Sequence, residues 1–369
     1  MTKQTLQEML SQFQLVGKLL HIDEFKRGHI HDTYISHWQN EGVITKFVHQ
    51  KINLHVFPDV DNLMSNIISV TEHVQKQLSV LGSNDKIFSV QKTTSGKSHA
   101  LVFSGDAPEC WRTLSFVENT KSYNTCDDPR VAKEAAAACG RFLGYLKDLD
   151  PNSLHVTIKD FLNSKVRLQQ LEQAVSQDVC SRRSECAEEV QKCFERMDFC
   201  GLVADRLGSP ELPLWVTHND TKLNNVLFDE TTEEAVSVVD LDTCMPGSIL
   251  FDFGDLVRTT SVLSAEDEPD PERVRFDLDL FDAISQGFVS EIASYLTPYE
   301  KEILYLAPKL LTFTLAMRFL ADHLNGDKYF KVHFPGHNLQ RARSQLRVVE
   351  CMEGLEEQMK TILESHVSS

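Results

Sequence analysis

Residues 217–229 read THNDTKLNNVLFD and lie between two apolar runs, residues 214–216 and 226–228. Both runs have the composition of buried segments. Polar groups placed beside an apolar core cost free energy unless a partner satisfies them. A stretch this rich in His, Asn, Asp and Lys is therefore either a satisfied polar cluster or a functional site.

The spacing of acids and amides favours a functional site. Asp220 lies five residues before Asn225, and the apolar run VSVV leads into Asp240. Phosphoryl transfer needs one carboxylate to orient the attacking hydroxyl and accept its proton. It also needs a carboxylate and an amide oxygen to hold Mg2+, which prefers oxygen ligands. A lone Asp in a loop is usually a turn or cap residue, but the whole pattern indicates Asp220 as the base and Asn225 and Asp240 as metal ligands.

Composition argues against several classes of protein. The chain has 369 residues, long enough for two lobes, and a net charge of −17. Binding of nucleic acid or of anionic membranes needs a cationic face, so neither is expected. We expect no membrane span and no export signal, and therefore a cytoplasmic protein. The nine cysteines should be free thiols, with Cys186, Cys193 and Cys200 as small residues on one helix face.

Periodicity divides the chain into a strand-rich part and a helix-rich part. Alternating patterns predict strands between residues 16 and 56 and again over residues 86–94, 99–104 and 111–119. Helical spacing predicts a helix from Pro58 to Gly82, and mainly helices from residue 129 onward. These patterns indicate an α+β protein. We expect a small antiparallel-sheet N-terminal lobe, residues 1–117, and a large, mainly helical C-terminal lobe, residues 118–369.

THNDTKLNN followed by VVDLD resembles the catalytic segment of the aminoglycoside phosphotransferase and choline kinase superfamily. Other segments are similar to one branch of it, the N-acetylhexosamine 1-kinases. They are GHIHDTY (28–34), FPDVDNLM (57–64), DLDTCMPGS (240–248), LFDFGD (250–255), MRFLADHLNGDKYF (317–330) and HNL (337–339). The similarity runs from about residue 12 to 350 and is weakest over residues 158–206.

This resemblance implies a protein-kinase-like two-lobe fold, ATP as co-substrate and Mg2+ as cofactor. The implied reaction places phosphate on the anomeric hydroxyl of N-acetylglucosamine or N-acetylgalactosamine. Asp220 would act on that hydroxyl, and His29, Arg318 and Tyr329 stand where this branch contacts its sugar. Arg318 could instead form an ion pair at the edge of the core, and Tyr329 could be a core aromatic. Asp242 is either a neighbour of the metal or a support for its ligands.

Residues of the first lobe are expected to hold ATP. Lys51 ends the third predicted strand and is the candidate for binding the phosphates, with Lys46 as its rival. The acidic partner of Lys51 is left open, with Glu72 as one option. Only Gly28 stands where protein kinases have a glycine-rich loop, so backbone amides of residues 29–32 would cradle the phosphates. The adenine would bond to backbone where the lobes join, at residues that include Val117 and Asn119.

Two short motifs are not interpreted as functional. Asp252-Phe253-Gly254 spells the metal motif of protein kinases, but no strand leads directly into it. We expect Asp252 to cap the helix that follows. Residues 94–98, TSGKS, match the end of a phosphate-binding loop, but Gln91 stands where that motif needs its first glycine. A hairpin turn is therefore expected at Ser95-Gly96.

Two other functions stay open. The chain could be another small-molecule kinase of the superfamily, acting on an antibiotic, choline or homoserine, or a non-catalytic kinase-like binding protein. The sequence does not distinguish N-acetylglucosamine from N-acetylgalactosamine, because the orientation of one hydroxyl separates them. Oligomeric state and nucleotide preference are open as well.

Overall fold

The computed structural model describes residues 3–25, 30–103 and 108–367. It divides into two compact units, each made of separate stretches of sequence. The first unit comprises Met1–Lys121, Asp148–Ile158 and Leu227–Met245. The second comprises Ser122–Lys147, Lys159–Val226 and Pro246–Ser369. The chain thus returns to the first unit twice after leaving it.

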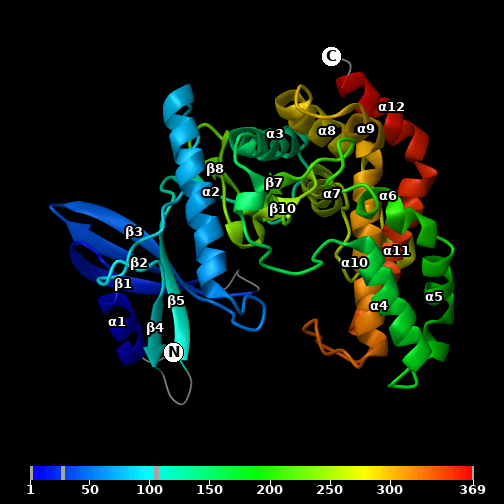
Figure 1. Cartoon of the computed structure of the whole chain (residues 1–369), viewed down its shortest axis with the longest axis horizontal. Coiled ribbons are helices and arrows are strands. Elements are labelled where there is room, and N and C mark those ends of the chain that lie inside the picture. The colour runs from blue at the N-terminus through cyan, green and yellow to red at the C-terminus, as the bar shows by residue number, and fades with distance from the viewer. Residues whose placement is uncertain (1–2, 26–29, 104–107, 368–369) are drawn as a thin grey trace. The chain divides into compact units, whose positions relative to one another are not determined.

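A five-stranded antiparallel sheet forms the centre of the first unit (Figure 1). Its strands are β1 (Lys18–Phe25), β2 (Asp32–Asn40), β3 (Val43–Lys51), β4 (Ala100–Phe103) and β5 (Pro108–Ser115), in spatial order β1-β2-β3-β5-β4. Glu41 and Gly42 join β2 to β3, and both have positive φ, the geometry that suits the twist of a two-residue hairpin. The strands predicted between residues 16 and 56 are confirmed.

The continuous strand predicted over residues 86–94 is wrong. Val90 makes an isolated bridge to Leu114 of β5, and Thr93 makes another to Phe13. Because the segment divides its backbone pairing between two neighbours, no regular ladder forms with either. The turn predicted after it is confirmed, since Gly96 has a φ of 82° and its amide donates to the Thr93 carbonyl at 2.9 Å.

Two helices belong to the first unit, α1 (Lys3–Ser11) and α2 (Val60–Leu81). The Asp59 side chain caps α2 by accepting the amide of Asn62, and Gly82 ends the helix with a φ of 62°. The predicted helix limits are therefore confirmed. One apolar cluster joins α1 to the sheet; it contains Met9, Leu10, Phe13, Tyr34, Ala100, Val102 and Trp111.

Two smaller sheets flank the polar stretch that was singled out in the sequence. β8 (Val226–Asp229) lies between β6 (Thr120–Lys121) and β9 (Ala235–Val238), and β7 (Trp215–Thr217) pairs with β10 (Met245–Gly247). Residues 218–225 therefore connect β7 to β8. Asp240 follows the end of β9.

Helices make up most of the second unit. They are α3 (Pro129–Leu146), α4 (Ser164–Gln177), α5 (Ala187–Phe194), α6 (Gly201–Ala204), α7 (Ile249–Thr260), α8 (Leu278–Ile292), α9 (Pro298–Ile303), α10 (Ala307–Leu324), α11 (His337–Gly354) and α12 (Glu356–Val367). Short 3-10 turns include η3 (Met197–Cys200), η4 (Leu223–Asn225), η5 (Leu241–Thr243) and η7 (Leu304–Leu306). A Cβ at Gly287 would lie 2.2 Å from the Lys133 carbonyl oxygen, so glycine is what allows α8 to approach α3 this closely.

One helical stretch of the described residues, Pro298–Leu324, is long and apolar enough to span a membrane by length and composition alone. In the structure, 72% of its most apolar window is buried. It consists of α9, η7 and α10, and α10 packs against α4, α7 and α11. Its apolar side chains therefore form core of the second unit.

Cys186, Cys193 and Cys200 are buried in the apolar cluster around α10, and all three are free thiols. The prediction that these three cysteines share one helix face is wrong. Cys186 precedes α5, Cys193 lies within α5, and Cys200 ends η3. Burial raises the pKa of Cys186 to about 11 and the pKa values of Cys193 and Cys200 to about 12. These thiols stay protonated and act as small core residues.

Candidate active site

The loop between β7 and β8 holds Asp220 beside a cation. The Nζ of Lys222 lies 2.6 Å from Oδ1 of Asp220, whose side chain is 18% exposed. Burial opposes the charge of Lys222, but the carboxylates of Asp220 and Asp255 hold its pKa above the usual value. Asp220 is thus an accessible carboxylate with a positive charge next to it. Lys222 belongs to the polar stretch 217–229 but was not among the predicted site residues.

Asp252 fixes the backbone of this loop. Its Oδ2 accepts the amide of His218 at 2.8 Å, and its Oδ1 accepts the amide of Asn219 at 2.6 Å. Thr221 adds a third bond from its hydroxyl to the Asp252 carbonyl. Asn219 has a φ of 63°, a left-handed conformation that these bonds stabilise. Asp220 directly follows Asn219, so Asp252 thereby sets the direction in which the Asp220 side chain points from the backbone.

Asp252 does not cap α7, so that prediction is wrong. The helix begins at Ile249, and the Ser248 side chain accepts the amide of Leu250 as its cap. Asp252 lies in the first helical turn and is completely buried. Burial raises its pKa to about 6, although the amides of His218 and Asn219 favour its ionised form. Its role is structural, as expected, but it supports the loop rather than the helix end.

Asn225 ends the same loop and directly precedes β8. Its Nδ2 donates to the Asp220 carbonyl at 2.9 Å. This bond assigns the amide nitrogen to the loop, so the amide oxygen is the atom that a cation would use. The residue is 8% exposed, which holds the side chain in a defined position.

Asp240 belongs to the first unit and follows β9. It has a φ of 65° and a ψ of 58°, which is unusual for a residue other than glycine. Such backbone conformations cost free energy and are found where function requires them. The 3-10 turn η5 begins immediately after Asp240 and contains Asp242.

Asp242 is held on both of its oxygens by residues of the first unit. Arg112 donates from Nη1 to Oδ1 and from Nη2 to Oδ2, the latter at 2.8 Å, and Nε2 of His31 lies 2.5 Å from Oδ2. The amide of Asn53 donates to Nδ1 of His31 at 3.0 Å, so Nε2 carries the proton and donates to Asp242. Burial opposes the charge of Asp242, but Arg112 and His31 outweigh it and depress its pKa. The structure thus favours the second interpretation of Asp242, a support for the turn next to Asp240.

The acidic partner of Lys51, which the sequence left open, is Glu109. The Nζ of Lys51 lies 2.8 Å from Glu109 of β5 and 3.8 Å from Asp32 of β2, and not beside Glu72 of α2. The hydrogen bond from Lys51 to Glu109 is the main reason that the pKa of Lys51 is raised. Lys46 has its own partner, because its Nζ lies 2.9 Å from Glu118.

The strand register assigns these residues to two faces of the sheet. Directly opposed residues in antiparallel strands share a face. Lys51 pairs with Asp32 and Trp111 and so lies on the face that α1 covers. Ile35, Val48 and Leu114 are opposed to one another and lie on the other face, as does Arg112. That face carries an apolar strip across β2, β3 and β5.

Arg318 of α10 lies among aromatic rings within the second unit. Its guanidinium carbon is 5.8 Å from the ring centre of Phe161, 5.4 Å from Tyr329 and 5.2 Å from Phe330. Its Nη2 donates to the Tyr329 hydroxyl at 3.3 Å, and burial lowers its pKa. Among the described residues no carboxylate lies within ion-pairing distance of Arg318, so the ion-pair alternative is not supported. Tyr329 is 60% exposed and is not a core aromatic.

A comparison with protein families matches residues 86–286 to the phosphotransferase enzyme family, APH. The match spans more than half of the chain. This chain belongs to the phosphotransferase enzyme family. It is a small-molecule kinase of the aminoglycoside phosphotransferase and choline kinase superfamily, which confirms the coarser part of the sequence-based identification.

Several solved structures share the fold of this phosphotransferase over nearly all of its length. An amicoumacin kinase in complex with AMP-PNP, Ca2+ and Ami has a TM-score of 0.59 at 10% identity, covering 95% of this chain and 94% of that one. A microcompartment-associated aminopropanol kinase has a TM-score of 0.55 at 13% identity, with coverages of 97% and 99%. A choline kinase from Cryptosporidium parvum Iowa II has a TM-score of 0.53 at 14% identity, with coverages of 95% and 93%. The predicted protein-kinase-like α+β fold is confirmed.

The residues predicted to bind the nucleotide and the sugar in the first unit include Gly28, His29, Val117 and Asn119. Gly28 and His29 lie outside the described residues. Val117 is buried and Asn119 has a φ of 58°, and both follow the end of β5. The Asn119 carbonyl accepts the amide of Glu230 at 3.1 Å, which orders the backbone there.

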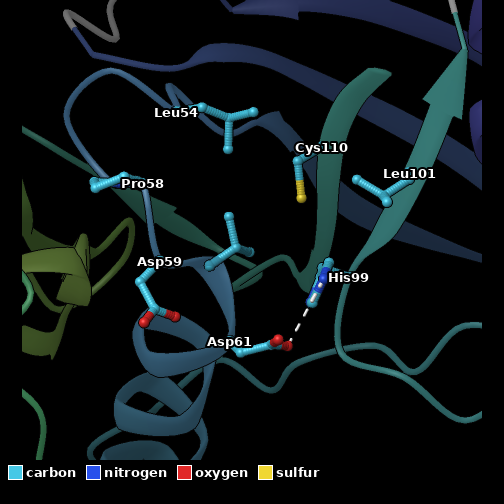
Figure 2. Close-up of a pocket in the computed structure, with 8 residues that line it drawn as sticks. Leu54, Pro58, Asp59, Asp61, His99, Leu101 and Cys110 are labelled. Atoms are coloured by element: carbon cyan, nitrogen blue, oxygen red, sulfur yellow. Dashed lines mark ion pairs between the residues drawn. The ribbon is translucent and has the colours of Figure 1, made fainter. Parts of the chain in front are cut away.

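An open pocket of about 460 Å3 lies elsewhere in the first unit (Figure 2). It is lined by Leu54, Pro58, Asp59, Val60, Asp61, His99, Leu101 and Cys110. Figure 2 shows His99 directed toward Asp61, with Nε2 and Oδ1 3.9 Å apart. None of the residues predicted for catalysis or substrate binding lines this pocket.

Arg112 and His31 are the support residues that the sequence analysis missed. The available signal was Arg112 itself, a charged residue inside the strand pattern WRTLS. An arginine that is 2% exposed needs a carboxylate partner. Nothing in the local sequence identifies that partner as Asp242, which is 130 residues away.

Proposed function

We propose that this phosphotransferase transfers the γ-phosphoryl group of ATP to the anomeric hydroxyl of an N-acetylhexosamine, either N-acetylglucosamine or N-acetylgalactosamine. The observation that supports a sugar is Arg318, a cation among three aromatic rings with no carboxylate partner in the described chain. Its guanidinium would donate to sugar hydroxyl or carbonyl oxygens, while Tyr329 and His29 would add contacts. The same cation would repel the ammonium groups of choline or of an aminoglycoside.

Asp220 would orient the anomeric hydroxyl and accept its proton. A new bond forms between the anomeric oxygen and the γ-phosphorus, the bond from that phosphorus to the bridging oxygen of ADP breaks, and ADP leaves. Lys222, 2.6 Å from Asp220, would stabilise the negative charge that gathers around the transferring group. Because Asp252 fixes the backbone amides before Asp220, the base would be positioned before the substrate arrives.

Asn225 and Asp240 would hold Mg2+. Both side chains offer oxygen atoms, the donors that this ion prefers, and the Nδ2 bond of Asn225 to Asp220 commits the amide nitrogen elsewhere. When bound, the ion would neutralise phosphate charge. The Arg112–Asp242 pair would keep the turn after Asp240 in place.

The first unit would bind the nucleotide. The apolar strip of Ile35, Val48 and Leu114 is suited to an adenine ring, and the backbone at Val117 and Asn119 would supply hydrogen bonds. The backbone around Gly28 is proposed for the phosphates. Lys51 was predicted for the same role, but the strand register places it on the opposite face of the sheet from this apolar strip, so it is not proposed as a phosphate ligand.

The test is ATP consumption with Mg2+ against N-acetylglucosamine, N-acetylgalactosamine, glucose, choline and kanamycin, followed by phosphorus NMR of each product. Phosphate on the anomeric carbon of an N-acetylhexosamine is the expected result and would rank the two sugars. Turnover of choline or kanamycin alone would overturn the sugar assignment and the roles of His29, Arg318 and Tyr329. Absence of any magnesium-dependent turnover would favour a non-catalytic binding protein.

A further inference from the structure

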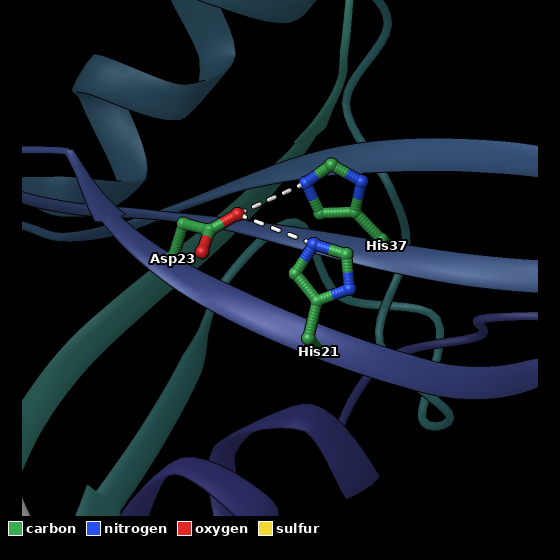
Figure 3. Close-up of side chains that lie close together, drawn as sticks. All are labelled: His21, Asp23 and His37. Carbon is green, nitrogen blue, oxygen red and sulfur yellow. Dashed lines mark ion pairs between the residues drawn. The ribbon is translucent and has the colours of Figure 1, made fainter.

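Three side chains of the first unit converge on one exposed patch of its sheet (Figure 3), on the face that carries Ile35, because Asp23 is paired with Ile35. Nε2 of His21 lies 3.4 Å and Nε2 of His37 lies 3.2 Å from the same atom, Oδ2 of Asp23. The two imidazole rings stack, with centres 4.0 Å apart and planes 19° apart. In the described part of the chain, this is the one group of three potential ligand residues whose donor atoms all lie within 4.8 Å of one another.

A β-bulge creates this arrangement. Leu19 pairs with Trp38 and His21 pairs with His37, so the register between β1 and β2 shifts at Leu20. Without the shift, His21 would share the face of Leu19, which packs against the core. The bulge turns His21 to the opposite face, directly across from His37, and Asp23 follows on that face two residues later.

We infer that His21, Asp23 and His37 form a binding site for a late first-row divalent cation, with Zn2+ as the best fit. Imidazole suits this group of metals, whereas Mg2+ prefers oxygen. Zn2+ binds nitrogen and oxygen ligands at about 2.0–2.2 Å in a tetrahedron, which separates neighbouring ligand atoms by roughly 3.3–3.6 Å. The two nitrogen–oxygen distances of 3.2 and 3.4 Å lie close to that separation.

The three side chains are accessible to solvent, and the charge of the nearest lysine is offset by a carboxylate. The side chains of His21 and Asp23 are 55% and 61% exposed, so water can complete the coordination of the cation. Lys46 opposes His37 on the neighbouring strand and is the nearest basic residue by register. Its charge is offset by Glu118, 2.9 Å from its Nζ.

A cation at this site would link β1 to β2, the strands on either side of residues 26–31. Because the three ligands come together only in the folded sheet, binding would favour the folded state by mass action. The inference is independent of the proposed substrate, and its experiment does not use kinase activity.

The experiment is titration of the metal-free full-length protein with Zn2+ by calorimetry and with Co2+ by absorption spectroscopy. We expect binding of one equivalent and a Co2+ spectrum without the charge-transfer bands of thiolate ligands, which excludes the nine cysteines. His21→Ala and His37→Ala should each weaken binding at least about tenfold, since loss even of outer-shell partners costs that much. Asp23→Asn should also weaken it, while His55→Ala, which removes an exposed histidine of the same unit, should not.

Melting curves of the metal-free variants establish that the sheet still folds. Zn2+ should raise the melting temperature of the wild-type protein and of His55→Ala, and should have little effect on the other three variants. The inference is overturned if the wild-type protein binds neither ion, which would leave the cluster as contacts between Asp23 and the two histidines. It is also overturned if affinity is unchanged in His21→Ala and His37→Ala, or if the Co2+ spectrum shows thiolate ligands.

Discussion

Arg112 and Asp242 form a bidentate ion pair. The side chain of Arg112 is 2% exposed and that of Asp242 is 6% exposed. A buried pair of charges has already lost its hydration, so each partner depends on the other. Asp242 is a residue of η5, and η5 directly follows Asp240, whose backbone is in the left-handed conformation. Stability and the proposed metal site therefore depend on the same contact.

Arg112→Met should lower the free energy of unfolding by about 3–5 kcal/mol, because it leaves the carboxylate of Asp242 buried without its cation. Urea unfolding measures this change. The double variant Arg112→Met, Asp242→Leu removes both charges and should recover much of the loss. Arg130→Met is the matched control, since Arg130 is 91% exposed and should change stability little. A double variant as unstable as the single one would contradict the pairing.

The contribution of Asp242 to stability should depend on pH. Arg112 and His31 depress its pKa in the folded protein in spite of burial, whereas the unfolded chain has the ordinary value. The contribution is therefore fully present above the ordinary carboxyl pKa of about 4 and is lost as the pH falls through the lower folded value. The difference in unfolding free energy between wild type and Asp242→Asn should shrink below about pH 4. A difference that stays constant from neutral to acidic pH would show that Asp242 is not ionised in the folded state.

Asp220→Asn should reduce kcat by about a hundredfold to ten-thousandfold, the usual contribution of a general base, with little change in nucleotide affinity. Single-turnover kinetics and nucleotide titration measure the two effects. Asp205→Asn is the control, because Asp205 is an exposed partner of Lys165 in the same unit. If Asp220→Asn keeps wild-type turnover, another group is the base.

Asp252→Asn should reduce kcat by about ten- to a hundredfold, as expected for a residue that orients a catalytic group. An asparagine can accept only one of the two amides of His218 and Asn219, so the loop before Asp220 loses a constraint. Substrate KM values should change little, which separates this role from substrate binding. Circular dichroism and melting curves check the fold, and an unchanged kcat in a folded variant would refute the role.

Tyr329→Phe should raise the KM for the sugar several-fold without altering the KM for ATP. The substitution removes the hydroxyl that accepts from Arg318 at 3.3 Å but keeps the ring beside the guanidinium. Tyr295→Phe is the control, because Tyr295 is 41% exposed in the same unit and contacts Lys147 instead. Equal effects of the two substitutions on the sugar KM would remove Tyr329 from the proposed site.

Local patterns predicted the elements whose causes are local. The limits of α2 follow from Asp59 and Gly82, and the turn between β2 and β3 follows from Glu41-Gly42. The segment over residues 86–94 has a strand pattern, but two different neighbours share its backbone. A single-strand pattern does not contain that information.

The same distinction applies to the site. The identity of Asp220, Asn225 and Asp240 could be read from spacing, and the structure leaves these roles as predictions. The supports could not be read in this way, because Asp242 meets His31 across 211 residues and Arg112 across 130. Asp252 was predicted to cap a helix, and its actual partners, the backbone amides of His218 and Asn219, could not be foreseen because they are 34 and 33 residues away. Long-range hydrogen bonds have no periodic signature in the sequence.

The interleaving of the two units has a consequence for synthesis of the protein. β8 and β9 contribute to the first unit, whose last stretch ends at Met245. Domains usually fold as units while the chain emerges from the ribosome. In this protein the first unit is complete only when its last stretch, Leu227–Met245, has been translated, more than a hundred residues after Lys121. Residues 1–121 alone would therefore contain all five strands of the main sheet but would lack β8, the partner of β6, and Asp242, the partner of Arg112 and His31.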